Sequence, residues 1–252
     1  MRRFTTVILC LLVLGNVGAE TLRIGVFLHS PVVMQKNPGG EPFGPGVEYA
    51  KAVARALGYE PKIELLPLSR IFPTLQSGDL DMSLELGMNE KRKAYVIYPD
   101  KPCFVTHPSL TVRAESPLAS IGSIDDVYGL RIGYLLGAYP GSFFAKATGV
   151  AFEYVAGDAW IAQNMGKLLS NRIDAILDQN EFSCLAEARR QGIEKKIRVI
   201  PLPGEDVKGY VLFSRKRPNA EALVRAYNAL NGSSGLPDVN TMLQEYLENE
   251  KK

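Results

Sequence analysis

The sequence predicts an α/β protein, because segments with the period of a β-strand alternate along the chain with segments that have the period of an α-helix. Its 252 residues are enough for one large domain or two modest ones. Two strand-like segments, LRIGV at 22–26 and LRIGY at 130–134, open the two halves of the chain in a similar way. The sequence has no internal repeats and no low-complexity tracts, which excludes a solenoid.

The N-terminal residues have the features of a secretory signal peptide, which we assign to residues 1–19. Arg2 and Arg3 precede an apolar run from Val7 to Val17, and small residues at 17–19 form a cleavage pattern. The run is too short and wrongly flanked for a membrane-spanning helix. Its removal lowers the formal net charge from +2 to 0, because it carries two arginines and no acids. A neutral mature chain gives no electrostatic argument for binding nucleic acid or an anionic membrane.

The first half is expected to begin with a strand at 22–26 and a loop at 37–46 that is rich in proline and glycine. Apolar residues at helical spacing predict a helix over 47–57, which Gly58 ends. Residues 62–65 are predicted to return as a strand.

Residues 67–99 form a predicted helix–strand–helix unit. Four apolar residues at i, i+3, i+4 and i+7 lie on one face of the first helix: Leu68, Ile71, Phe72 and Leu75. Gly78 ends that helix. Alternating apolar and polar residues then predict a strand over 80–86.

The end of this strand is a candidate ligand site. Gly87 leaves the backbone bare enough for a ligand to approach, and Asn89 can cap a helix whose first turn carries Arg92. A guanidinium beyond the carboxyl end of a strand, beside free helix N–H groups, is suited to hold a carboxylate or phosphate. The alternative is that residues 90–93 are only a solvated cluster of charges on a helix.

The second half continues the alternation. Residues 104–113 are expected to be extended. The further predictions are strands at 130–134, 173–177, 197–200 and 209–214, and helices at 158–169, 180–191, 220–230 and 239–249.

The run SGDLD at 77–81, the strand after it, NEKR at 89–92 and the tyrosine- and proline-bearing segment that follows resemble the extracellular solute-binding proteins of family 3. These are periplasmic binding proteins for polar amino acids. The resemblance extends over almost the whole mature chain and implies a type II periplasmic binding protein fold, with two α/β lobes joined by a two-strand hinge. It places residues 20–104 and 208–252 in lobe 1, and residues 105–207 in lobe 2.

The same resemblance implies roles for residues of the cleft. Arg92 takes the position of the arginine that grips the ligand α-carboxylate. Ala138 and Tyr139 lie in the loop that touches this carboxylate, although of that loop's motif only the preceding glycine matches. Gln179 stands where the family has an aspartate that meets the ligand ammonium. Asp178 lies one residue early and is expected on the other face of its strand unless the strand end bulges.

Several further positions depart from the family pattern. Phe27 replaces an aspartate, Leu68 replaces a stacking aromatic residue, and Glu85 replaces a small residue near the amine end. Arg70 appears where the family often has glycine. Arg70 and Arg92 could form a double clamp for an anion, or Glu85 could neutralise Arg70.

The resemblance, together with these departures, implies a periplasmic binding protein without catalytic residues, cofactor or metal. We expect two lobes that close over a small carboxylate-bearing or anionic solute, which is not a standard α-amino acid bound in the usual way. The expected partners are an inner-membrane permease or sensor, and the expected state is a monomer. One alternative is an enzyme that resembles cyclohexadienyl dehydratase, with Glu181 or Glu85 as acid. The other is a sensory or accessory module with a degenerate pocket.

The remaining histidines and cysteines suggest no further chemistry. His29 and His107 have no partners at metal-ligand spacing. Cys103 and Cys184 could pair in an oxidising compartment. The family comparison puts one near the lobe crossover and the other in lobe 2, where a bridge would hinder closure, and this favours two free, buried thiols over a disulfide.

Overall fold

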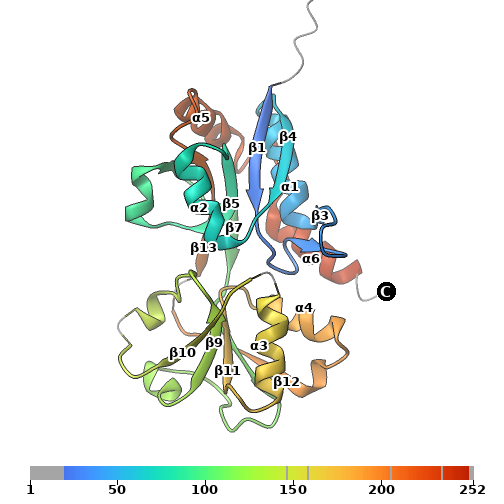
Figure 1. The fold of residues 1–252 in the computed structure, drawn as a ribbon, viewed down its shortest axis with the longest axis vertical. Helices are drawn as coiled ribbons and strands as arrows, with labels where there is room; N and C mark the ends of the chain where they lie inside the picture. The colour runs from blue at the N-terminus through green and yellow to red at the C-terminus, as the bar shows by residue number, and fades with distance from the viewer. Residues whose placement is uncertain (1–19, 146, 158, 205, 234, 250–252) are drawn as a thin grey trace, which may run out of the picture.

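The computed structural model describes residues 20–145, 147–157, 159–204, 206–233 and 235–249. The predicted signal peptide lies outside these ranges. Among the described residues, no helix is long and apolar enough to cross a bilayer. The chain forms two lobes, one above the other in Figure 1, and each lobe has its own sheet.

The upper lobe contains a six-stranded sheet with the order β4-β1-β5-β13-β6, and β7 also pairs with β13. Strand β1 pairs in parallel with β4 and β5, whereas β13 runs antiparallel to β5. Its strands are β1 (Thr21–Val26), β4 (Glu60–Leu65), β5 (Met82–Gly87), β6 (Val96–Ile97), β7 (Phe104–Thr106) and β13 (Val207–Ser214), beside a small hairpin of β2 (Met34–Gln35) and β3 (Pro42–Phe43). Its helices are α1 (Pro45–Ala56), α2 (Leu68–Ser77), α5 (Ala220–Leu230) and α6 (Val239–Asn249).

The lower lobe contains a five-stranded sheet with the order β10-β9-β11-β8-β12. Strand β8 runs antiparallel to both of its neighbours, and the other pairs are parallel. The elements are β8 (Ser109–Arg113), β9 (Arg131–Leu135), β10 (Ala151–Val155), α3 (Trp160–Leu169), β11 (Ala175–Asp178), α4 (Ser183–Arg190) and β12 (Ile197–Pro201). The described part of the chain also contains four short 3-10 helices: η1 (Glu90–Ala94), η2 (Ile124–Val127), η3 (Ser142–Phe144) and η4 (Glu194–Lys196).

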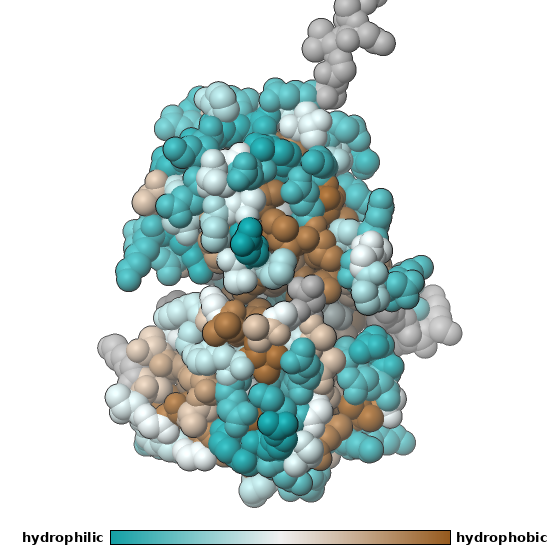
Figure 2. Space-filling model, in the orientation of Figure 1, coloured by the Kyte–Doolittle hydropathy of each residue, from teal (hydrophilic) through white to brown (hydrophobic). Residues whose placement is uncertain are grey.

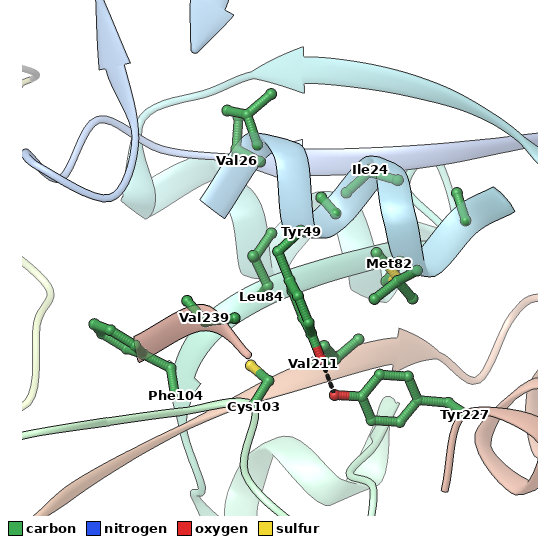
Figure 3. Packing of buried hydrophobic residues seen from close by; sticks show 14 of the residues in the cluster. Ile24, Val26, Tyr49, Met82, Leu84, Cys103, Phe104, Val211, Tyr227 and Val239 are labelled. Atoms are coloured by element: carbon green, nitrogen blue, oxygen red, sulfur yellow. Dashed lines mark hydrogen bonds between the residues drawn. The ribbon is translucent and has the colours of Figure 1, made fainter. Parts of the chain in front are cut away.

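Each lobe is held together by its own apolar core. In the upper lobe, Tyr49 from α1 and Tyr227 from α5 point toward each other through the core, with their hydroxyl oxygens 2.8 Å apart (Figure 3). This hydrogen bond satisfies two polar groups that would otherwise be buried at a cost. Cys103 lies in this core and Cys184 in the core of the lower lobe, and both thiols are free and buried.

The other predicted helices and the long strands are confirmed with small shifts at their ends, but the helix expected after Asn89 is only a short 3-10 helix, η1. Helix α4 begins at Ser183 rather than at 180, because the Asn180 side chain accepts the Phe182 N–H in a local turn. The extended run at 104–113 is divided between the two sheets as β7 and β8. The chain leaves the upper sheet after β7 and returns to it with β13, while the lobe boundaries at residues 104–105 and 207–208 stay a prediction.

Candidate functional site

A cavity of about 740 Å³ is lined by residues of both lobes. The upper lobe contributes the ends of β1 and β5, the start of α2 and η1. The lower lobe contributes the ends of β9 and β11 and the loop that leads into η3. Apolar side chains gather at the waist between the lobes on the face seen in Figure 2. Side chains from the carboxyl ends of parallel strands therefore meet in one cleft, as is usual for α/β folds.

The structure brings most of the sequence-predicted site residues together in this cavity. Those in its wall are Phe27, Leu68, Glu85, Gly87, Arg92, Ala138, Tyr139 and Gln179. Arg70 is exposed and lies outside the wall, because it is about 200° around the axis of α2 from Leu68. Among the described residues, no ion pair joins Arg70 to Glu85. The wall therefore contains only one of the two arginines proposed for a double clamp.

Arg92 is presented to the cavity by η1, where Asn89 caps the turn by accepting the Lys91 N–H. The Arg92 guanidinium lies 3.6 Å from the centre of the Phe72 ring, a cation–π contact. Its Nη1 also lies 3.4 Å from the Gly87 carbonyl oxygen. Among the described residues, no carboxylate lies within 4.0 Å of Arg92. The guanidinium is thus held in place but keeps its charge available to a ligand.

Glu85 reaches the cavity from a β-bulge. Between the pairs Ser83–Leu212 and Leu86–Tyr210, strand β5 has one residue more than β13. Glu85 occupies this bulge with φ 64°, a left-handed conformation that is uncommon for a residue other than glycine. Such strain costs about 1–3 kcal/mol and often marks a functional position. The bulge directs the Glu85 carboxylate against Gly46 in the first turn of α1, where the helix dipole favours a negative charge.

His29 lies between Glu85 and Asp178. Its backbone N–H donates to Val33 O, and its carbonyl accepts the N–H groups of Val32 and Val33, so the turn after β1 is fixed. The His29 Nε2 lies 3.2 Å from Asp178 Oδ1, and the Nδ1 lies 3.8 Å from Glu85 Oε2. Asp178 belongs to the lower lobe, whereas His29 and Glu85 belong to the upper lobe. The imidazole therefore contacts carboxylates of both lobes.

These three side chains are largely removed from water. The exposed fraction is 13% for the His29 side chain, 2% for Glu85 and 3% for Asp178. The ring of His29 also stacks on Phe27, with 5.7 Å between the ring centres. Burial lowers the pKa of His29, but Asp178 and Glu85 together raise this pKa to about 10. Burial raises the pKa of Glu85, and the nearby imidazolium opposes this shift.

The expected placement of Asp178 was wrong. A residue one position before Gln179 was expected to point to the other face of the strand, but both residues line the cavity. Strand β11 ends at Asp178, so the strand alternation no longer holds at the next residue. The cleft therefore contains a carboxylate beside the amide of Gln179. This carboxylate already has His29 as its partner.

The cavity wall also carries other acidic and basic side chains, which differ in whether they have an oppositely charged partner. Besides Glu85 and Asp178, the acids are Glu90, which pairs with Lys93 at 2.7 Å, and Asp206, which pairs with His107 at 2.7 Å. Lys91 and Lys208 also line the cavity; like Arg92, they have no carboxylate within 4.0 Å among the residues that the structure describes. Arg92, Lys91 and Lys208 are therefore the positive groups of the wall that have no acid partner among the described residues, whereas the buried acids share the one imidazole of His29.

Sequence reasoning did not identify His29 and Asp178 as partners. They are 149 positions apart in the sequence, and neither belongs to a sequence motif that would point to the other. The available signal was the position of His29 three residues after the end of β1, near the carboxyl end of a parallel strand. Within the described part of the chain, no group of three or more histidine, cysteine and acidic side chains could hold a metal ion.

Comparison with known proteins gives a family match over most of the chain. The family model described as bacterial extracellular solute-binding proteins, family 3, matches residues 22–229. No match was found among curated proteins.

Solved structures share the fold at low sequence identity. An amino acid ABC transporter substrate-binding protein from Streptococcus pneumoniae bound to L-arginine is 17% identical, with a TM-score of 0.72 over 92% of this chain and 96% of that chain. An ancestral arginine-binding protein bound to glutamine is 21% identical, with a TM-score of 0.68 over 91% and 95%. Holo ArgBP from T. maritima is 18% identical, with a TM-score of 0.69 over 90% and 96%.

Proposed function

The chain belongs to the bacterial extracellular solute-binding proteins of family 3, which have the type II periplasmic binding protein fold, and on that premise we propose that it binds a small anionic solute in the periplasm. The two lobes close over the solute and hand it to an inner-membrane permease or a sensor. The protein acts as a monomer without a cofactor. The observation that carries this proposal is the pattern of charges in the cavity wall.

Arg92 is the seat for the solute carboxylate. Its guanidinium offers paired N–H donors that match a carboxylate, and the Phe72 ring beneath it fixes the plane in which these donors lie. Lys91 and Lys208 are exposed residues of the cavity wall and add to its positive potential. Unpaired positive charge in a partly enclosed cleft attracts an anion.

The mode of binding differs from that of a standard α-amino acid. A ligand ammonium needs an unpaired carboxylate, because an isolated charge is costly to bury. The two most buried acids of the wall are both in contact with His29. The solute is therefore a carboxylate or another anion that does not depend on an ammonium contact.

A binding role fits Glu85 better than a catalytic one. A general acid must come within hydrogen-bond reach of its substrate. Both carboxylate oxygens of Glu85 are buried behind the wall, and Glu181 lies outside the wall, where its Oε2 accepts the His107 N–H. Glu85 lines the wall but exposes neither carboxylate oxygen to a substrate in the cavity, and Glu181 is not part of the wall.

The test is a thermal-shift screen of residues 20–252 against monocarboxylates, dicarboxylates, inorganic anions and amino acids, followed by calorimetry on each hit. A ligand at a hundred times its dissociation constant adds about 2.7 kcal/mol to the free energy of unfolding, which is readily visible. The substitution Arg92→Ala should weaken a hit by about 30-fold or more. The matched control is Arg70→Ala, which removes an exposed arginine outside the wall and should leave affinity unchanged. If no anion binds, or if Arg92→Ala retains full affinity, the proposal fails.

A further inference from the structure

The His29 imidazole fills the position between two buried carboxylates that a cationic group of a ligand would otherwise require. Asp178 Oδ1 and Glu85 Oε2 approach different nitrogens of the ring, at 3.2 and 3.8 Å. Ser183 Oγ lies 3.3 Å from Nε2, and the Phe27 ring stacks on the imidazole. Both ring nitrogens are thus engaged by protein atoms. The cleft contains its own cation, which is bound to the protein and cannot leave.

The strained backbone of Glu85 is a second observation in favour of His29 as the cation between the two carboxylates. A bulge residue with φ 64° is normally glycine, and a glutamate there is held against its backbone preference. This backbone conformation directs the Glu85 carboxylate of the upper lobe toward His29. Neither oxygen of Glu85, nor Oδ2 of Asp178, has a hydrogen-bond partner among the described residues, and the His29 ring lies between the two carboxylates.

The rest of the wall is suited to a ligand with a flat, apolar ring. Its aromatic residues come from both lobes: Phe27, Phe72, Tyr134, Tyr139, Phe143, Trp160 and Tyr210. The Tyr139 side chain is available to a ligand, since the residue is 59% exposed in this structure. A cavity of about 740 Å³ is within the range that binds drug-sized molecules and exceeds what a small aliphatic acid would fill.

We propose that the cleft selects a monocarboxylate with an apolar ring and no ammonium group, and that His29 determines this specificity by occupying both buried carboxylates. This inference rests on the proposed binding of an anion at Arg92. The carboxylate lies at Arg92, and the ring lies among the aromatic side chains of the wall. An ammonium group on the same ligand would have to give up its water shell without finding an unpaired acid.

Three compounds that share a phenyl ring on a two-carbon chain test the selectivity on the unaltered protein. Hydrocinnamate has the ring and the carboxylate, phenylalanine adds an ammonium group, and phenethylamine has the ammonium group alone. Calorimetry should show hydrocinnamate binding at least about tenfold more tightly than phenylalanine, and no binding of phenethylamine. Propanoate, alanine and ethylamine form a second trio without the ring, and propanoate should bind at least about tenfold more weakly than hydrocinnamate.

The substitution His29→Gln tests whether His29 causes the preference for a ligand without an ammonium group. It removes the positive charge, keeps a polar side chain and leaves Glu85 and Asp178 without their cation. Phenylalanine should then gain at least about tenfold relative to hydrocinnamate. Asp178→Asn is the control, because it removes a carboxylate while His29 stays beside Glu85, and it should produce no gain. If His29→Gln does not fold, the wild-type comparison still decides the selectivity.

The outcomes separate this inference from the proposed function. If phenylalanine binds the wild-type protein as tightly as hydrocinnamate, the inference is overturned while binding of an anion stands. If propanoate binds as well as hydrocinnamate, the ring is not recognised and that part is overturned. If His29→Gln folds and the preference is unchanged, His29 is not its source. If neither these carboxylates nor any anion of the screen binds, the proposed function fails together with the inference.

Discussion

Removing the charge of His29 by raising the pH should reduce the stability of the protein. In the folded state, Asp178 and Glu85 raise the His29 pKa to about 10, although burial alone would lower it. In the unfolded chain the pKa returns to about 6.5. A raised pKa means that the folded state holds the proton more tightly, so this stabilisation is complete below pH 6.5 and is lost as the pH rises toward 10.

The magnitude follows from the size of this shift. Each unit corresponds to 1.36 kcal/mol, so the interval from 6.5 to about 10 sets an upper limit of about 5 kcal/mol. The charged groups that face the imidazole are Asp178 from β11 and Glu85 from β5. Burial raises the pKa of Tyr134, which lies beside Asp178. Burial also raises the pKa of Cys103, to about 12. These two groups contribute their own pH dependence and require a matched control.

The assay is urea-induced unfolding at pH 7, 8, 9 and 10, performed on the wild type and on His29→Gln. Contributions from cysteines and tyrosines are common to both proteins, so the difference between the two profiles reports His29. The free energy of unfolding of the wild type should fall by at least about 2 kcal/mol more than that of the variant over this interval. Parallel profiles would refute the reasoning, because they would mean that His29 is not charged between these carboxylates at neutral pH.

Three further predictions concern the same region and the core. Gly46→Ala should destabilise the protein by about 1–3 kcal/mol in urea unfolding, because the added methyl group collides with Glu85 Oε1. Asp81→Ala should cost about 3–5 kcal/mol by the same measurement, since Asp81 is buried and pairs with Arg23 at 2.8 Å. Small-angle X-ray scattering without solute should give a larger radius of gyration for His29→Gln than for the wild type, because the contact with Asp178 joins the two lobes. A radius equal to that of the wild type would contradict this.

Much of the fold could be predicted because it depends on local patterns. The helix over α2 is encoded by apolar residues at helical spacing and by Gly78, which adopts φ 86° at its end as expected. Arg92 could be placed at the site because the whole unit from α2 to η1 is continuous in the sequence. Strand β10 was not predicted, since its residues are mostly half-buried or exposed and lack the apolar alternation of an interior strand.

The electrostatics of the site could not be predicted in the same way. Glu85 belongs to a strand whose alternation gives no sign of a bulge, and the bulge depends on pairing with β13, more than a hundred residues later in the chain. Asp178 and Gln179 both reach the cavity because β11 ends between them. A shift of one residue at a strand end reverses the face on which a side chain lies, so small errors in an expected boundary change which charges enter a cleft.

The contact between His29 and Asp178 bears both on which solute the cleft selects and on how readily the two lobes close. A binding protein whose lobes are held together only by its solute reports the solute through closure. Here part of the interface is an internal ion pair, which favours the closed arrangement before any solute is present. A solute bound at Arg92, as proposed above, would then need to supply less of the free energy of closure, and it would need no positive group for that purpose. Under the proposed assignment, the same imidazolium lowers the demand on the solute and restricts which solutes the cleft accepts.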